Sequence, residues 1–370
     1  MGKIYEERLD RILGAVALEP VDRVPVVLEY AGFAAHVTDT LMADFLRDPD
    51  LNLATMLAAW DMVGEGDAIN YASFWPYGLC ESFLCKVRIP GVDLADDEMW
   101  QMDETELMKP EDYDRILESD WPDYFRRFLD ERVLDDVPAE YLPPQRQFPD
   151  AVGAWRAKGV PVLSGGDVTT PYELLCGARS LMEFCVDLMT IPDKLSQVMD
   201  HMAPHLTGAA IASAKARGQS GVWLGGWRTA PAMLSPEMWD RFVWPYFRQL
   251  VGEIHAAGLI TYLHLDSNWT RELARFRELP AGACVMALDG ETDIRAARRE
   301  LADHMCIMGD VPASLLFDGS EADVSEYCTS LMRDMRDLGG DSGFILQSGC
   351  DIPTNAKREN VAAMVRAATG

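Results

Sequence analysis

The chain has 370 residues, and its 60 Asp and Glu outnumber its 33 Lys and Arg to give a formal net charge of −27. So acidic a surface repels phosphate backbones and anionic lipids, which disfavours nucleic acid and membrane surfaces as partners. Hydrophobic residues at 48% and charged residues at 25% are typical of a folded globular protein. The length suits one large domain or two ordinary ones.

Features near the start of the chain and the use of cysteine bear on its location. Residues 1–8 contain no apolar segment of the kind found in secretory signals, and no run of 18 or more apolar residues is present anywhere. The eight cysteines are scattered singly, without a Cys-x-x-Cys pair. These features predict a cytoplasmic protein with reduced thiols.

The first half of the chain contains two predicted strands, at residues 24–28 and 68–71. Nearly ninety residues separate the second strand from the next predicted one, too many for a simple loop. Within this stretch, residues 93–140 hold 18 acidic and five basic side chains, a balance of −13. Residues 108–113 have Pro110 and acidic residues where a helix would begin. We therefore expect residues 75–160 or so to form an acidic helical insertion between strands two and three, packed on the main domain.

The second half alternates between short apolar segments and amphipathic ones. The predicted strands are residues 161–164, 221–224, 260–263, 284–288, 306–308 and 344–347. The predicted helices are residues 172–189, 193–217, 236–257, 270–277, 291–301, 323–338 and 357–368. This alternation predicts parallel βα units, and eight strands in all favour one α/β domain over residues 1–370, a (β/α)₈ TIM barrel. A doubly wound open sheet is the alternative, although no Gly-x-Gly-x-x-Gly follows any strand.

Chemistry in such a barrel is built at the carboxyl ends of the strands, where three metal-binding residue types are predicted to meet. Residues two apart on a strand face the same side, so His264 and Asp266 both face the mouth, and Cys350 follows the last strand. Imidazole, carboxylate and thiolate are zinc ligands, and three of them with an open position form a catalytic site. In the competing interpretation His264 is a hydrogen-bonded barrel residue, Asp266 a helix cap and Cys350 a small buried hydrophobe.

These residues stand in stretches that resemble the uroporphyrinogen decarboxylase superfamily over most of the chain from about Arg8 onward. The resemblance is strongest in Leu-Ser-Pro-Glu-Met-Trp (234–239), Tyr-Leu-His-Leu-Asp-Ser-Asn (262–268), Gly-Phe-Ile-Leu-Gln-Ser-Gly-Cys-Asp-Ile-Pro (343–353) and Glu-Asn-Val-Ala-Ala-Met-Val (359–365). It implies a (β/α)₈ barrel. The decarboxylases themselves carry Arg-Gln-Ala-Gly-Arg-Tyr after the first strand, whereas this chain has Leu28-Glu29-Tyr30-Ala31-Gly32-Phe33. Because Glu29 would repel a porphyrinogen with many carboxylates, the chain looks closer to the cobalamin-dependent methyltransferases of the superfamily.

Those methyltransferases usually bind zinc with His-x-Cys and a later Cys, and Asp266 stands where the first Cys would be. The harder carboxylate ligand leaves zinc a stronger Lewis acid, which suits polarising an ether oxygen. The resemblance thus implies a zinc-dependent O-demethylase that passes a methyl group from a small substrate, with an aromatic methyl ether favoured, to the cobalamin of a separate corrinoid protein. The alternatives are a decarboxylase of a small carboxylic acid, an Asp266 that only orients His264, and loss of the metal.

Further residues at the predicted strand ends are candidates for catalysis and substrate binding. Glu29 or Glu173 is expected to assist proton transfer, and these two, Asp289 and Asp310 are the candidates to complete the metal shell. Tyr30, Trp75 and Trp227 are expected to stack on a planar substrate or to surround a methylammonium group. Arg228 is expected to pair with a substrate carboxylate or within the protein itself. The oligomeric state is left open, a homodimer being one option.

Overall fold

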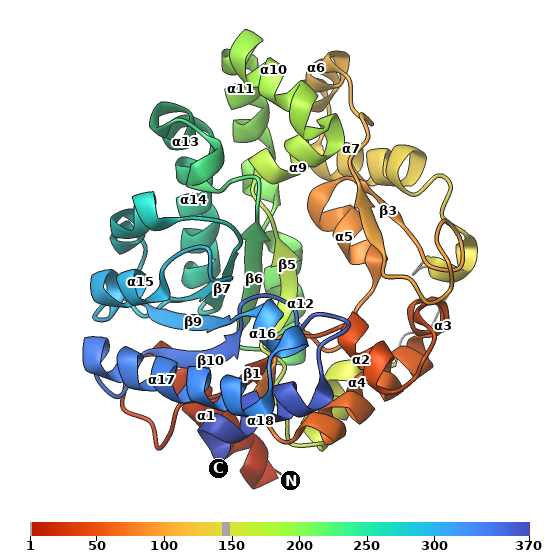
Figure 1. Ribbon diagram of the computed structural model, residues 1–370. Coiled ribbons are helices and arrows are strands. Elements are labelled where there is room, and N and C mark those ends of the chain that lie inside the picture. The colour runs from red at the N-terminus through yellow and green to blue at the C-terminus, as the bar shows by residue number, and fades with distance from the viewer. Residues whose placement is uncertain (1, 143–148) are drawn as a thin grey trace.

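A parallel six-stranded sheet forms the centre of the computed structural model, which describes residues 2–142 and 149–370 (Figure 1). Its strand order is β10-β9-β8-β7-β6-β5. The strands are β5 (Ser164–Val168), β6 (Gly221–Gly226), β7 (Ile260–Leu265), β8 (Cys284–Leu288), β9 (Cys306–Val311) and β10 (Phe344–Ser348). Most of their residues are buried, as in a parallel sheet whose strands are covered on both faces. The α/β class expected from the sequence is confirmed.

A separate parallel pair, β1 (Val27–Leu28) and β2 (Ala68–Ile69), lies beside this sheet. An isolated parallel bridge joins Val26 to Leu346 of β10, and another joins Ile69 to Val162, just before β5. The pair is therefore linked to both edge strands of the six-stranded sheet. Each segment predicted to be a strand contains strand or bridge residues, and β5 runs four residues further than expected.

Three helices predicted from the sequence are each divided in two. The pairs are α9 (Pro171–Arg179) with α10 (Leu181–Thr190), α11 (Pro192–Met202) with α12 (Gly208–Arg217), and α13 (Pro236–Phe242) with α14 (Trp244–Ala256). Ser180 has a φ of 70°, a left-handed conformation that ends α9. Pro204 and Pro245 stand at the other two breaks, and proline cannot donate the backbone hydrogen bond that continues a helix.

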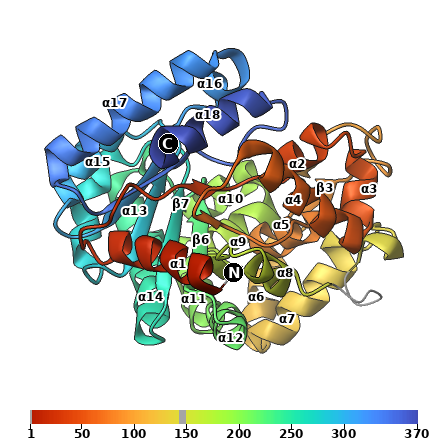
Figure 2. The same ribbon diagram turned by 90° about the horizontal axis from the view of Figure 1, so that it is seen from below.

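The remaining helices outside the segment between β2 and β5 lie against the strands or pack on other helices (Figure 2). They are α1 (Gly2–Val16), α2 (Gly32–Val37), α3 (Met42–Arg47), α4 (Pro49–Val63), α15 (Ile294–Leu301), α16 (Ala313–Asp318), α17 (Glu321–Gly339) and α18 (Arg358–Thr369), with 3₁₀ helices at Ala203–His205, Pro231–Met233 and Thr270–Glu278. Among the described residues, none of the helices combines the length and the apolar character that crossing a bilayer requires.

The segment between β2 and β5 contains both helices and a small sheet. Its elements are α5 (Pro76–Phe83), β3 (Lys86–Arg88), β4 (Gln101–Asp103), α6 (Pro110–Glu118), α7 (Trp121–Phe128), a π-helical turn at Leu129–Val133, a 3₁₀ turn at Ala139–Tyr141 and α8 (Ala151–Ala157). The predicted helix start is confirmed, because the Asp112 carboxylate accepts a hydrogen bond from the backbone N–H of Lys109 at 2.8 Å. The antiparallel β3–β4 pair was not expected.

Candidate metal centre

The structure brings His264, Asp266 and Cys350 together at the carboxyl ends of two strands. His264 lies near the end of β7, Asp266 follows β7 and Cys350 follows β10. Sγ of Cys350 lies 3.5 Å from Nε2 of His264, and Oδ1 of Asp266 lies 3.4 Å from the same nitrogen. Three ligand atoms, one from each residue, lie within 4.8 Å of one another. The predicted triad is therefore a candidate metal site.

The spacing and chemistry of this triad fit zinc. With Zn–N and Zn–O distances of about 2.0 Å and a Zn–S distance of about 2.3 Å, two ligands on one tetrahedral zinc stand roughly 3.3 to 3.6 Å apart. The separations around His264 fall in that range. An ionised carboxylate, a thiolate and a neutral imidazole balance the charge of a divalent ion, and nitrogen and sulfur donors disfavour magnesium and calcium.

The electrostatics of the three side chains also favour a positive charge at their centre. Burial disfavours a protonated His264, but the charges of Cys350 and Glu29 and the hydrogen bond to Asp266 outweigh it and raise the pKa of His264. Burial would raise the pKa of Asp266, yet its contact with His264 lowers it below the usual range. Burial raises the pKa of the Cys350 thiol. A bound cation would take the place of the proton that this environment attracts.

Glu29 is held on the other side of the imidazole ring. Its Oε2 accepts hydrogen bonds from Nδ2 of Asn70 at 2.8 Å and from Nε2 of Gln347 at 2.7 Å, and its Oε1 lies 3.8 Å from Nδ1 of His264. The carboxylate is buried. A carboxylate facing the second nitrogen of a metal-binding histidine orients the ring and strengthens it as a ligand.

A cavity of about 450 Å³ opens beside the triad, within the size range of small-molecule sites. Most of its walls are aromatic or small residues. Its lining consists of Glu29, Asn70, Tyr71, Ser73, Phe74, Trp75, Tyr77, Gly78, Leu79, Ser82, Phe83, Met102, Ser164, Gly166, Asp167, Trp223, Gly226, Trp227, His264, Asp266, Cys350 and Asp351. Among the described residues, no Lys or Arg lines it. Trp75 and Trp227, two of the predicted substrate contacts, do line it.

Trp223 is a cavity residue that the sequence interpretation missed. The centroid of its ring lies 5.4 Å from that of His264. A Cβ atom on Gly225 would lie 2.3 Å from the Trp223 ring, so the indole occupies space that only glycine leaves open. Trp223 lay inside the predicted strand and was therefore not considered, but Gly225 and Gly226 two and three residues later were a signal of close approach.

Tyr71 and Asp351 form a second polar pair in the cavity wall. The hydroxyl of Tyr71 donates a hydrogen bond to the Asp351 carboxylate. Burial and the nearby charge of Glu29 raise the pKa of Asp351 to about 7. Both residues stand at predicted strand ends, but neither was predicted to have a role in the site.

Three predicted site residues lie outside the cavity lining. Tyr30 is fully buried, and its hydroxyl donates to the carbonyl of Met56 at 2.9 Å. Glu173 is also fully buried and accepts from the backbone N–H of Arg228 at 2.7 Å. The Arg228 guanidinium is paired with Glu173 and with Glu104. Arg228 therefore pairs within the protein, which is the second of the two expectations stated for it. A substrate carboxylate would have to displace Glu173 or Glu104 to reach the guanidinium.

Asp289 and Asp310 are likewise engaged elsewhere. The Asp289 carboxylate accepts from the backbone N–H groups of Ser267 at 2.7 Å and Glu291 at 2.9 Å. Asp310 accepts from the hydroxyl of Tyr327 at 2.7 Å. Neither is among the cavity-lining residues, and the described metal-binding cluster contains neither.

Comparisons with known proteins bear on the family and the fold of the chain. The "Uroporphyrinogen decarboxylase (URO-D)" family model matches residues 146–370. The uroporphyrinogen decarboxylase of Pelobacter propionicus is 23% identical, over 96% of this chain and 97% of that protein. The enzyme of Coxiella burnetii is 26% identical over 141 residues, which cover 36% of this chain and only 37% of that protein.

A solved structure shares the fold. A methyltransferase from Methanosarcina mazei superposes with a TM-score of 0.71 at 18% identity, covering 96% of each chain. The likeness at this identity is one of fold. Because the family model spans more than half of the sequence, the chain belongs to the uroporphyrinogen decarboxylase family.

Proposed function

We propose that this protein transfers a methyl group from a small aromatic methyl ether to the Co(I) atom of a separate corrinoid protein, with zinc held by His264, Asp266 and Cys350. One observation carries the proposal: the triad borders a cavity that has aromatic walls and, among the described residues, no Lys or Arg in its lining. A flat aryl ether suits such walls. A substrate with many carboxylates has no cationic partner there.

The chain's own residues prepare the ether for transfer. Bound zinc would supply a Lewis acid for the ether oxygen. Glu29 orients His264 through Nδ1, and the aromatic walls exclude water and hold the substrate ring. The Co(I) of a docked corrinoid protein would supply the electron pair that bonds the methyl carbon, the electron pair of the broken carbon–oxygen bond would stay on the oxygen, and the phenolate would take up a proton from solvent as it leaves. Glu173, which is buried against Arg228, takes no part in this scheme.

We further propose that the eight parallel strands close into a single (β/α)₈ barrel carrying the segment between β2 and β5 as an insertion. The two isolated bridges, Val26 to Leu346 and Ile69 to Val162, support closure. In such a barrel the carboxyl ends of the strands form the catalytic face, which is where the triad lies.

Metal content and turnover together test the proposed function. We expect the purified protein to hold about one zinc per chain, and Asp266→Ala and Cys350→Ala each to lose it. Cys185→Ala is the matched control, because Cys185 is an exposed thiol on α10, and it should keep the metal. Methyl transfer from an aryl methyl ether to free cob(I)alamin should require His264. A metal-free protein whose methyl transfer is unchanged by His264→Ala would contradict the proposal.

A second candidate function is decarboxylation of a small carboxylic acid, which the curated relatives favour because they are uroporphyrinogen decarboxylases. It predicts CO₂ release that needs neither zinc nor cobalamin. Release of labelled CO₂ from candidate acids by the metal-free protein would support it over methyl transfer.

A further inference from the structure

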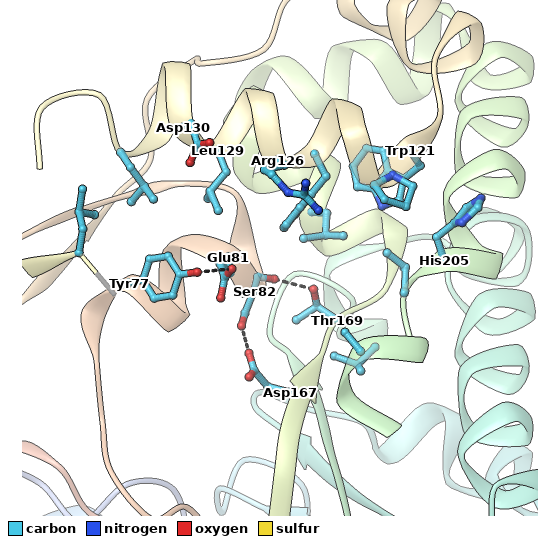
Figure 3. A pocket seen from close by; sticks show the side chains of 18 residues that line it. Tyr77, Glu81, Ser82, Trp121, Arg126, Leu129, Asp130, Asp167, Thr169 and His205 are labelled. Carbon is cyan, nitrogen blue, oxygen red and sulfur yellow. Dashed lines mark hydrogen bonds between the residues drawn. The ribbon is translucent and has the colours of Figure 1, made fainter. Parts of the chain in front are cut away.

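A second cavity, of about 790 Å³, is shown in Figure 3. It adjoins the cavity beside the metal triad, which is called the metal cavity from here on. It lies among α5, α7, α9 and the start of α12, and three residues line both cavities: Tyr77, Ser82 and Asp167. These three therefore form a shared wall. Asp167 belongs to β5, and it is the strand partner of Trp223 on β6.

Among the described residues, the Asp167 carboxylate has no cationic partner. Asp167 lines both cavities, between them. It accepts a hydrogen bond from the hydroxyl of Ser82, and no described Lys, Arg or His forms an ion pair with it. Burial and the charge of Glu81 raise the pKa of Asp167 to about 6.

None of the other described charged groups around the shared wall forms an ion pair with this carboxylate. Glu81, one helical turn after Tyr77, accepts a hydrogen bond from the Tyr77 hydroxyl instead of from a cation. Arg126 on α7 and His205 before α12 also line the second cavity, and neither pairs with Asp167. Figure 3 places both on elements away from the Ser82–Asp167 pair.

We infer that Asp167 binds the ammonium group of the substrate, so that the methyl donor is a methoxylated aromatic amine. Asp167 and the metal triad line the same cavity. Trp223 lies next to both, because it is the strand partner of Asp167 and its ring lies beside that of His264. An aromatic ring lying along these walls would direct its methoxy group to the triad and its ammonium group to Asp167. This inference rests on the proposed function for the methyl transfer itself.

The charge of the whole cavity agrees with a cationic substrate. Besides Asp266, which belongs to the triad, three carboxylates line it, those of Glu29, Asp167 and Asp351. Complementary charge between a site and its ligand selects against the wrong partner, so an anion is excluded and a cation is favoured. Trp and Tyr rings add attraction for an ammonium group.

Three ethers of matched shape test the inference: para-methoxyphenethylamine, para-methoxyphenethyl alcohol and para-methoxyphenylacetate. We expect kcat/KM for methyl transfer to cob(I)alamin to be at least about tenfold higher for the amine than for the alcohol, and lowest for the acetate. Asp167→Asn should lower the ratio of amine to alcohol by about tenfold to a hundredfold, the range expected for one hydrogen bond to a charged group. Asp167→Glu should restore part of the ratio. Asp337→Asn, the same change on the exposed side of α17, should leave the ratio as it is.

The outcomes separate this inference from the proposed function. Turnover of the alcohol without preference for the amine, or a ratio that Asp167→Asn does not change, overturns the role of Asp167 and leaves methyl transfer standing. If no ether is demethylated, calorimetry of phenethylamine binding tests the ammonium site by itself. Binding to the wild type that weakens in Asp167→Asn supports that site. No binding to the wild type overturns it.

Discussion

Oε1 of Glu29 lies 3.8 Å from Nδ1 of His264, while Nε2 of the same ring faces Sγ of Cys350 at 3.5 Å. The imidazole is thus placed between a fixed anion and the candidate metal position. The distance to Glu29 is longer than a hydrogen bond, so the carboxylate acts on the ring mainly through its charge.

Replacing Glu29 with Gln should therefore weaken zinc binding. Loss of such a partner costs about 10-fold to 100-fold in metal affinity. Competition with a chromophoric chelator measures the dissociation constant. Asp337→Asn serves as a control for the loss of one negative charge. An equal affinity for zinc in Glu29→Gln and in the wild type would show that Glu29 does not strengthen His264 as a ligand.

Bound zinc should protect one cysteine from alkylation. Cys350 is half-buried and lies in the triad, whereas Cys185 is exposed on α10. We expect iodoacetamide to modify both residues in metal-free protein and only Cys185 after zinc is added, because a metal-bound thiolate is shielded. Mass spectrometry of the peptides measures both in one sample. Equal modification of Cys350 with and without zinc would argue against a thiolate ligand.

Gly225→Ala should disturb the wall of the metal cavity. The new Cβ would meet the Trp223 ring at 2.3 Å, so the indole must move from its place beside His264. We expect a loss of stability of about 1–3 kcal/mol, typical of overpacking, together with a lower kcat. Gly252→Ala on α14 is the control, since its Cβ would meet no atom within 4 Å. That change should stabilise the protein by about 0.5–1 kcal/mol in urea denaturation.

Asp310→Asn should change the pH dependence of stability. Burial raises the pKa of Asp310 to about 6, despite a hydrogen bond from Tyr327 that opposes the shift. The folded state therefore holds a proton that the unfolded chain has released, and wild-type stability falls as the pH rises from about 4 to about 6. Because Asn has no carboxyl group to ionise, the stability of the variant does not fall in this pH interval through this group.

At a pH near 8 we expect Asp310→Asn to be more stable than the wild type by about 1–3 kcal/mol, and at a pH near 4 the two should be similar. Urea denaturation at both pH values measures the difference. A gain of the same size at both would show that the Asp310 carboxyl does not titrate in this interval.

Arg228→Met should leave Glu173 as a buried carboxylate without its ion pair. The side chains of both residues are fully buried. Breaking a buried pair by removing one partner costs about 3–5 kcal/mol. The double variant Arg228→Met, Glu173→Gln should recover part of that free energy of unfolding. A single variant as stable as the wild type would mean that the pair contributes little.

Much of the fold was predictable because each strand is short, apolar and followed by an amphipathic stretch. The long helices were predicted too long, since hydrophobic periodicity continues through Pro204 and Pro245 although the backbone does not. The β3–β4 pair was missed because each strand has only three residues, too few for an alternation of polar and apolar residues to be recognised. Whether such short segments pair depends on tertiary contacts, which the local sequence pattern does not predict.

The metal triad was predictable because its three residue types follow strand ends, and parallel strands bring those ends together. Arg228 shows the limit of that argument, since proximity to a strand end does not determine which way a long side chain turns. One of its two carboxylate partners, Glu104, lies more than a hundred residues earlier in the chain. Asp167 stood at a strand end as well, but only the structure revealed that no described Lys, Arg or His forms an ion pair with it.

The contact between Glu104 and Arg228 has a consequence for how the molecule unfolds. Glu104 follows β4 in the acidic segment, and its Oε1 accepts a hydrogen bond from Nε of Arg228 at 2.7 Å. Detaching this segment would leave the buried Arg228 guanidinium with Glu173 alone, without the second of its two carboxylate partners. The acidic segment and the sheet should thus unfold together in a single cooperative transition. The segment would then be required for the stability of the whole fold.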